Sequence, residues 1–198
     1  SKDVLNTIPE VLTCFDEPFA DSSAIPTYIV SRETKKQVKV ALSGDGGDEL
    51  FAGYRLYTGE YLYSRYRLFP GILRKKIIEP LLLSLPDSRS KRLLDYLRRM
   101  KKFIIGAQDK FEERFFSWNE IFSRESRESI INKQKIEVEK IRFDSGKDMI
   151  HNKLNFFDGD KINRMLYADL TNSLPHDMLA KVDLMSMKNS LEVRVPIL

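Results

Sequence analysis

The stretch 38–51, which reads VKVALSGDGGDELF, constrains the fold of this chain more than any other part of it. Its first five residues form a short β-branched and apolar run, which is typical of a strand. A glycine-rich turn follows, and an apolar, aromatic segment that predicts a helix comes directly after the turn. Strand, glycine-rich turn and helix is the order in which α/β folds build ligand sites at the carboxyl ends of strands. The sequence therefore predicts an α/β protein with a binding site at this turn.

The rest of the chain divides into three zones. Residues 1 to about 60 contain a predicted helix over 25–36, and three prolines are expected to divide this zone into short segments. Residues 60 to 150 predict several amphipathic helices, and residues 150–198 return to mixed helix that ends in an extended piece at 192–196. The expected breaks in the first two zones lie at Pro9, Pro18, Pro26, Pro70, Pro80 and Pro86.

Composition excludes several classes of protein. Apolar residues make up 42% of the 198 residues and charged residues 31%, which excludes an intrinsically disordered chain. The single cysteine, Cys14, excludes an internal disulfide framework and fits a reducing compartment. No apolar run approaches the roughly 20 residues that span a bilayer. We therefore expect a cytoplasmic protein without membrane contacts. Because the chain starts at Ser1 and stops after an apolar segment, we also expect a piece of a larger protein.

The turn 43–49 is the strongest local signal for chemistry. Its three glycines, within four positions, let the backbone adopt positive φ angles and expose N–H groups that could hold an anion. The same turn carries Asp45, Asp48 and Glu49, which would repel a phosphate unless a divalent cation lay between them. Mg²⁺ binds in this way, through one or two carboxylates and substrate phosphates. The alternative is an ordinary surface turn, because aspartate and glycine are common turn residues.

Two further clusters have structural alternatives to a functional role. Asp21, with the two serines after it, is favoured as a cap for the helix predicted at 25–36, rather than as a ligand. Asp177 and Lys181 are four residues apart and could form an ion pair on a helix surface. Three nearby methionines, Met178, Met185 and Met187, are expected to fill the core.

A basic segment, 65–102, contains twelve lysine and arginine residues but three acidic residues. Such a segment, with tyrosines beside it, could bind the backbone of RNA or DNA. Basic residues on amphipathic helices more often form a solvated face, and we favour that interpretation. Nucleic-acid binding stays the alternative, in which the chain is a non-catalytic basic helical module.

Three separated motifs resemble those of a known family. DEPFADSSAIPTY (16–28) and ALSGDGGDELFAGY (41–54) come first, and LPHDMLAKVDLMSM (174–187) with SLEVRVP (190–196) follows. In this order they closely resemble the synthetase domain of glutamine-hydrolysing asparagine synthetases. The resemblance implies that 1–198 is part of that C-terminal domain, with an α/β fold of the adenine-nucleotide α-hydrolase (HUP/PP-loop) type. This part would be mostly helical with few parallel strands, and 60–150 would form a helical layer.

The resemblance also implies a reaction. ATP adenylates the side-chain carboxylate of aspartate and releases pyrophosphate, and ammonia from glutamine then displaces AMP to give asparagine. ATP and Mg²⁺ are the implied cofactors, and an N-terminal glutaminase domain of the same parent chain is the implied partner, with a homodimer also compatible. Related domains use the same chemistry to amidate sugars of cell-surface polysaccharides or to close β-lactam rings, so the acceptor stays open.

Site residues follow from the positions that match the family's motifs. The resemblance implies that Ser43 and three glycines, Gly44, Gly46 and Gly47, contact the nucleotide and that Asp48 helps to hold Mg²⁺. Asp45, where glutamate is common, and Tyr54 are implied in catalysis. Four residues are implied on the substrate side: Asp21, Asp183, Glu192 and Arg194. Ala52 stands where the family commonly has glycine.

Two catalytic parts of the family do not occur in the chain. The pyrophosphate loop Ser-Gly-Gly-x-Asp-Ser would lie upstream of Ser1, and the lysine of the adenylation step would lie beyond Leu198. We therefore expect the 198 residues alone to be inactive.

Overall fold

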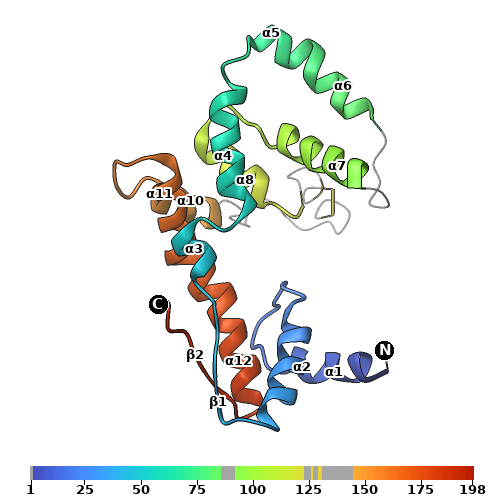
Figure 1. Cartoon of the computed structure of the whole chain (residues 1–198), viewed down its shortest axis with the longest axis vertical. Helices are drawn as coiled ribbons and strands as arrows, with labels where there is room; N and C mark the ends of the chain where they lie inside the picture. The colour runs from blue at the N-terminus through green and yellow to red at the C-terminus, as the bar shows by residue number, and fades with distance from the viewer. Residues whose placement is uncertain (1, 86–91, 123–125, 127–128, 131–144) are drawn as a thin grey trace. The chain divides into compact units, whose positions relative to one another are not determined.

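The computed structural model describes residues 2–85, 92–122, 126, 129–130 and 145–198. The chain forms two compact units, one made of residues 1–53 and 166–198 and the other of residues 54–165. The described residues are mostly helical with one small parallel sheet, which is consistent with the predicted α/β class (Figure 1).

The first unit joins the two ends of the chain. From the N-terminal part come helices α1 (Lys2–Leu12) and α2 (Ala24–Lys35), strand β1 (Val40–Leu42) and the short helix α3 (Gly47–Phe51). The C-terminal part supplies the wide-turned π-helix η3 (Asp169–Leu179), helix α12 (Ala180–Lys188) and strand β2 (Glu192–Arg194). The predicted helix at 25–36 and the extended piece near 192–196 are thus confirmed.

β1 and β2 pair in parallel, with Val40 opposite Glu192 and Leu42 opposite Arg194. Helix α12 packs along α2, which brings the C-terminal helix against the N-terminal part (Figure 1). The core of this packing contains Val11, Ala24, Tyr28 and Met185, with Cys14, Phe15, Phe19 and Ile25 around it. Met185 has no exposed surface and meets its prediction as core, whereas Met187 is 60% exposed and does not, because it lies on the other side of α12.

The second unit is all helical in its described residues. Its elements are α4 (Arg55–Tyr66), α5 (Gly71–Leu73), the π-helical η1 (Arg74–Ile78), α6 (Glu79–Ser84), α7 (Arg92–Ile105), α8 (Phe111–Asn119), α10 (Ser145–Leu154) and α11 (Lys161–Ala168), which runs on into the first unit.

A buried ion pair organises the centre of the second unit. The guanidinium of Arg114, which is fully buried, donates through Nε and Nη2 to the two carboxylate oxygens of Glu60, each at 2.7 Å. Its Nη1 donates to the carbonyl oxygen of Gln108 at 2.6 Å, and its carbon Cζ lies 3.7 Å from the ring centroid of Tyr63. Each charge of the pair is therefore satisfied inside an aromatic core.

The prediction that Pro80 ends a helix is wrong. It lies near the start of α6, and α5, η1 and α6 follow one another without a gap. Pro9 likewise lies inside α1, and Pro26 in the first turn of α2, where the missing N–H has no partner to lose. The wide turns of η1 come just before Pro80, and Pro175 lies within η3. A π-helical turn makes room for the ring that would clash in an α-helix. Pro70 does precede a new helix, while Pro86 lies outside the described residues.

Among the described residues, every helix is too short or too polar to cross a membrane.

Candidate functional site

The glycine-rich turn leaves the carboxyl end of β1 and enters α3. The backbone N–H of Ser43 donates to the carbonyl oxygen of Arg194 at 2.9 Å, which extends the parallel pairing by one bond. This bond fixes the end of β2 beside the start of the turn. Two segments about 150 positions apart in the sequence therefore meet at one sheet edge.

Asp45 is held inside the turn by Ser43. The Ser43 hydroxyl donates to the Asp45 carboxylate, and the Asp45 N–H lies 3.3 Å from the same hydroxyl oxygen. Both residues are half-buried. The carboxylate at this position is therefore oriented rather than free to rotate in solvent.

The three glycines of the turn differ in their conformation. Gly46 has a φ of 86° and is buried, and a Cβ there would lie 2.6 Å from Cδ2 of Leu198. Gly44 and Gly47 do not have positive φ angles, so Gly46 is the glycine of the turn that uses this freedom. A Cβ on Gly44 would meet nothing within 4 Å. Only the position before α3 has to reverse the chain direction tightly, and glycine is needed there for both angle and space.

Asp48 lies in the first turn of α3 and is exposed. Gly53 donates its N–H to the carbonyl oxygen of Asp48 at 2.9 Å, and a Cβ on Gly53 would fall 1.9 Å from Oδ1 of Asp48. The lack of a side chain at Gly53 thus leaves room for the Asp48 carboxylate. Ala52, between them, has a φ of 57°. Its departure from the family's glycine therefore falls on a left-handed position, where a Cβ is strained.

No group of three or more histidine, cysteine, aspartate or glutamate side chains forms a metal cage within the described residues. One or two turn carboxylates would fit Mg²⁺, which often keeps water and substrate phosphates as its other ligands. Asp48, exposed beside Gly53, is the carboxylate in the turn that suits this role.

Asp21 forms an ion pair across the unit and also caps the start of α2. The Nζ of Lys181, on α12, lies 2.5 Å from Oδ2 of Asp21 and 2.7 Å from Oγ of Ser23. Oδ1 of Asp21 accepts the backbone N–H of Ser23 at 2.9 Å, which confirms the capping interpretation for Asp21. Ser23 itself makes no side-chain capping bond.

Lys181 therefore does not form the predicted surface pair with Asp177. Lys181 is only 6% exposed, and Oδ1 of Asp177 is buried without a hydrogen-bond partner among the described residues. Burial and the neighbouring charge of Asp21 raise the pKa of the Asp177 carboxyl, although Lys181 opposes them. Burial by itself would raise the pKa of Asp21, but the hydrogen bonds from Lys181 and Ser23 outweigh it and lower that pKa. The two carboxyls beside one lysine thus shift in opposite directions.

The remaining site residues belong to β2, to α12 and to the start of the second unit. Arg194 Nε is 2.6 Å from Oε1 of Glu192, and both side chains are exposed on one face of β2, as predicted. Asp183 is exposed, and two positions along a helix place it away from the buried Lys181 side of α12. Tyr54 belongs to the second unit, where it precedes α4 and its ring lies 6.0 Å from that of Tyr57.

The sequence did indicate that Lys181 is buried, although its spacing of four residues from Asp177 favoured a surface ion pair. Met178 and Met185 lie three and four positions on either side of it, so Lys181 falls on the apolar stripe of the helix. A lysine that is buried on such a stripe is usually paired with an anion. Nζ of Lys181 also lies 3.5 Å from Sδ of Met178.

Comparisons with known proteins agree with the motifs. The family model described as "Asparagine synthase" matches residues 1–198. Asparagine synthetase [glutamine-hydrolyzing] 1 of Bacillus subtilis is 31% identical over 197 residues, which cover 100% of this chain and 29% of that protein. A putative asparagine synthetase of Mycobacterium bovis is 31% identical over 194 residues, covering 96% of this chain and 27% of its own length.

A putative asparagine synthetase of Methanocaldococcus jannaschii is 50% identical over 60 residues, 30% of this chain and 12% of that protein. No solved structure matches the chain. The chain spans less than a third of the length of these relatives. The family match over the whole chain confirms the resemblance: the chain belongs to the asparagine synthase family.

Proposed function

We propose that this chain is part of the synthetase domain of an ATP-dependent ligase that converts the side-chain carboxylate of aspartate into an amide. Family membership over residues 1–198 carries the proposal, because the relatives are named as glutamine-hydrolysing asparagine synthetases. The turn after β1 supports it, since open α/β sheets bind ligands outside the carboxyl ends of their strands. The adenine-nucleotide α-hydrolase type of fold is part of the same proposal.

The reaction has two steps. A carboxylate oxygen of aspartate attacks the α-phosphorus of ATP, and the bond to the bridging oxygen breaks so that pyrophosphate leaves. Ammonia then attacks the acyl carbon and loses a proton, and AMP leaves with asparagine as the product. Glutamine supplies the ammonia through an N-terminal glutaminase domain of the same parent chain.

We assign the phosphate end of ATP to the turn. Ser43, Gly44, Gly46 and Gly47 would line it, because glycines without side chains let backbone N–H groups approach an anion closely. Gly46 takes the left-handed conformation that turns the chain into α3. Mg²⁺, held in part by Asp48, would supply positive charge that stabilises the departing pyrophosphate.

Asp45 is proposed to take part in the ammonia step. Its bond with Ser43 orients a carboxylate that can accept a hydrogen bond from ammonia and hold the proton that it loses. Aspartate is one methylene shorter than the glutamate common in the family, so a water molecule would bridge the difference. Tyr54, which follows Gly53 in the chain, is also proposed to take part in catalysis.

The substrate side is assigned to the four remaining residues. Arg194 and Glu192 present charges at the end of β2, next to the turn. Asp21 would act through Lys181, whose ammonium it holds in place, and so would position the substrate side rather than contact it. Asp183, which is exposed on α12, is assigned to the substrate side as well.

Pyrophosphate release tests this function and identifies the acceptor. The protein that carries this chain together with the rest of the relatives' length would be supplied with ATP, Mg²⁺ and ammonia, with aspartate or a uronic-acid nucleotide sugar. We expect release that depends on aspartate. Release with the sugar acid alone would keep the chemistry and replace the acceptor, and no release with either would contradict the proposal.

A further inference from the structure

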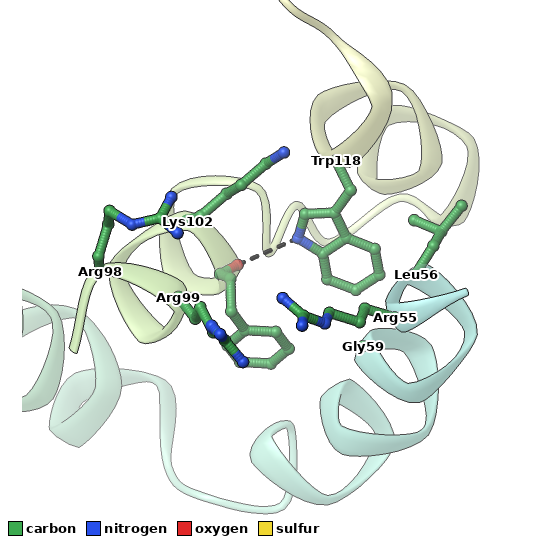
Figure 2. Close-up of a pocket in the computed structure, with 8 residues that line it drawn as sticks. Arg55, Leu56, Gly59, Arg98, Arg99, Lys102 and Trp118 are labelled. Atoms are coloured by element: carbon green, nitrogen blue, oxygen red, sulfur yellow. Dashed lines mark hydrogen bonds between the residues drawn. The ribbon is translucent and has the colours of Figure 1, made fainter. Parts of the chain in front are cut away.

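The second unit contains a pocket that the proposed reaction does not use. It has a volume of about 290 Å³ and lies between α4, α7 and α8 (Figure 2). This is near the lower end of the roughly 300–1,000 Å³ typical of small-molecule sites. Its lining consists of Arg55, Leu56, Gly59, Arg98, Arg99, Lys102, Phe103 and Trp118.

The floor of the pocket is aromatic and closely fitted. The rings of Phe103 and Trp118 stack with centroids 5.7 Å apart and an interplanar angle of 21°, and Nε1 of Trp118 donates to the carbonyl oxygen of Phe103 at 3.2 Å. A Cβ on Gly59 would lie 3.4 Å from Trp118, and one on Gly106 would lie 2.1 Å from it. Gly106 therefore makes room for the indole, whereas a Cβ on Gly59 would be in ordinary contact with it; the Trp118 side chain is half-buried.

The rim of the pocket is cationic. In Figure 2, Arg98, Arg99 and Lys102 come from α7 on one side, and Arg55 reaches in from α4. Among the described residues, these four cations have one carboxylate paired with them, Asp95, which accepts from Arg98 at 2.8 Å and also pairs with Arg99.

Arg55 and Lys102 have no ion-pair partner in the part of the chain that the structure describes, so the pocket keeps an excess of positive charge. Arg98 is already paired with Asp95, so the unpaired charge lies on Arg55 and Lys102.

We infer that this pocket binds a small phosphorylated molecule with a planar ring, such as a nucleoside monophosphate. The phosphate would lie between Arg55 and Lys102, because guanidinium and ammonium groups are the usual partners of phosphate oxygens. The planar ring would lie against the Trp118 indole. A volume of about 290 Å³ has room for one small molecule of this kind. The residues that line this pocket all belong to the second unit, whereas the glycine-rich turn belongs to the first.

Trp118 is the only tryptophan of the chain, so its fluorescence reports on this pocket directly. The chain would be titrated with uridine monophosphate, uridine, inorganic phosphate and tripolyphosphate, with circular dichroism of the same samples as a check on folding. We expect uridine monophosphate to quench Trp118 and to bind at least ten times more tightly than uridine or phosphate. Tripolyphosphate that binds as tightly, without quenching, would overturn the role of the ring and leave inorganic polyphosphate as the ligand.

A matched pair of double variants tests the rim. Arg55→Ala with Lys102→Ala removes one arginine and one lysine from the pocket, and Arg67→Ala with Lys76→Ala removes the same charges from exposed positions outside it. Calorimetry in the protein of the relatives' length should show at least tenfold weaker uridine monophosphate binding in the first pair and less than a twofold change in the second.

Equal weakening of binding in both double variants would overturn the proposed site in favour of a diffuse basic surface. The same conclusion would follow if only single-stranded RNA bound, with a steep salt dependence.

Discussion

Lys181 Nζ lies 2.5 Å from Asp21 Oδ2, although the two residues are 160 positions apart in the sequence. The bond ties the start of α2 to α12. Because the lysine side chain is 8% exposed and the aspartate side chain 25%, solvent screens this ion pair only in part. The pair therefore links the substrate side of the proposed site to the packing of the first unit.

Replacing Lys181 by methionine should destabilise the first unit. The change keeps the length of the side chain but leaves Asp21 and Asp177 without a cation, and breaking such a pair costs about 3 kcal/mol. Chemical denaturation would measure the loss. Lys188→Met, at an exposed position of the same helix, should change the free energy of unfolding by less than about 0.5 kcal/mol. Equal losses in the two variants would contradict the role given to the ion pair.

The two carboxyls beside Lys181 should respond to pH in opposite ways. The pKa of Asp21 is lowered in the folded state, so its stabilising contribution is present above the unfolded pKa and is lost as the pH falls through the folded value. The pKa of Asp177 is raised, so its contribution is present at low pH and is lost as the pH rises through the folded value.

Asp177→Asn should therefore raise the free energy of unfolding at pH 7 and have a smaller effect near pH 3. Denaturation curves at both pH values would check this, with Asp183→Asn, an exposed carboxylate on α12, as the control. A gain in stability at pH 3 that matched the gain at pH 7 would rule out the charge of Asp177 as the cause.

Ala52→Gly should stabilise the protein. Ala52 has a φ of 57°, a left-handed conformation that costs a residue with a Cβ about 1–2 kcal/mol. Part of this gain is lost because glycine is more flexible in the unfolded chain, so we expect a net increase of about 1 kcal/mol. Ala180→Gly, at a right-handed helical position, should instead lower the stability by about 1 kcal/mol. Thermal denaturation would compare them, and a loss of stability in both would refute the account of Ala52.

Gly46 and Gly44 offer a matched comparison within one turn. Gly46→Ala should destabilise the unit by about 1–2 kcal/mol, because it forces a Cβ into a left-handed position, whereas the exposed Leu198 side chain can move aside. Gly44→Ala should leave stability nearly unchanged, since a Cβ there meets nothing within 4 Å. Similar losses at both positions, measured by chemical denaturation, would show that the turn differs from this description.

Local patterns predicted the site's main elements correctly. The β-branched run at 38–42 and the glycines after it indicated a strand, a turn and a helix, and the structure has β1 and α3 on either side of that turn. The spacing of Glu192 and Arg194 indicated one shared face, and their 2.6 Å ion pair confirms it.

Interactions across the fold were beyond such patterns. Asp177 and Lys181 have the spacing of a helix-surface pair, but the packing of α12 on α2 buries Lys181 and offers it Asp21 instead. Pro80 should end an α-helix, but π-helical turns just before it accommodate the ring. The pocket beside Trp118 draws on three helices, and the basic segment alone gave no sign of its aromatic floor.

The Mg²⁺ dependence of aspartate-dependent pyrophosphate release tests whether Asp48 holds Mg²⁺ at the glycine-rich turn. It would be measured in the protein of the relatives' length for the unchanged sequence, for Asp48→Asn and for Asp158→Asn, an exposed carboxylate far from the turn in sequence. If the turn holds Mg²⁺ through Asp48, the Asp48→Asn variant should need at least ten times more Mg²⁺ for half-maximal release, and the Asp158→Asn variant should match the unchanged protein. An unaltered Mg²⁺ requirement in Asp48→Asn, at an unaltered rate, would contradict the claim.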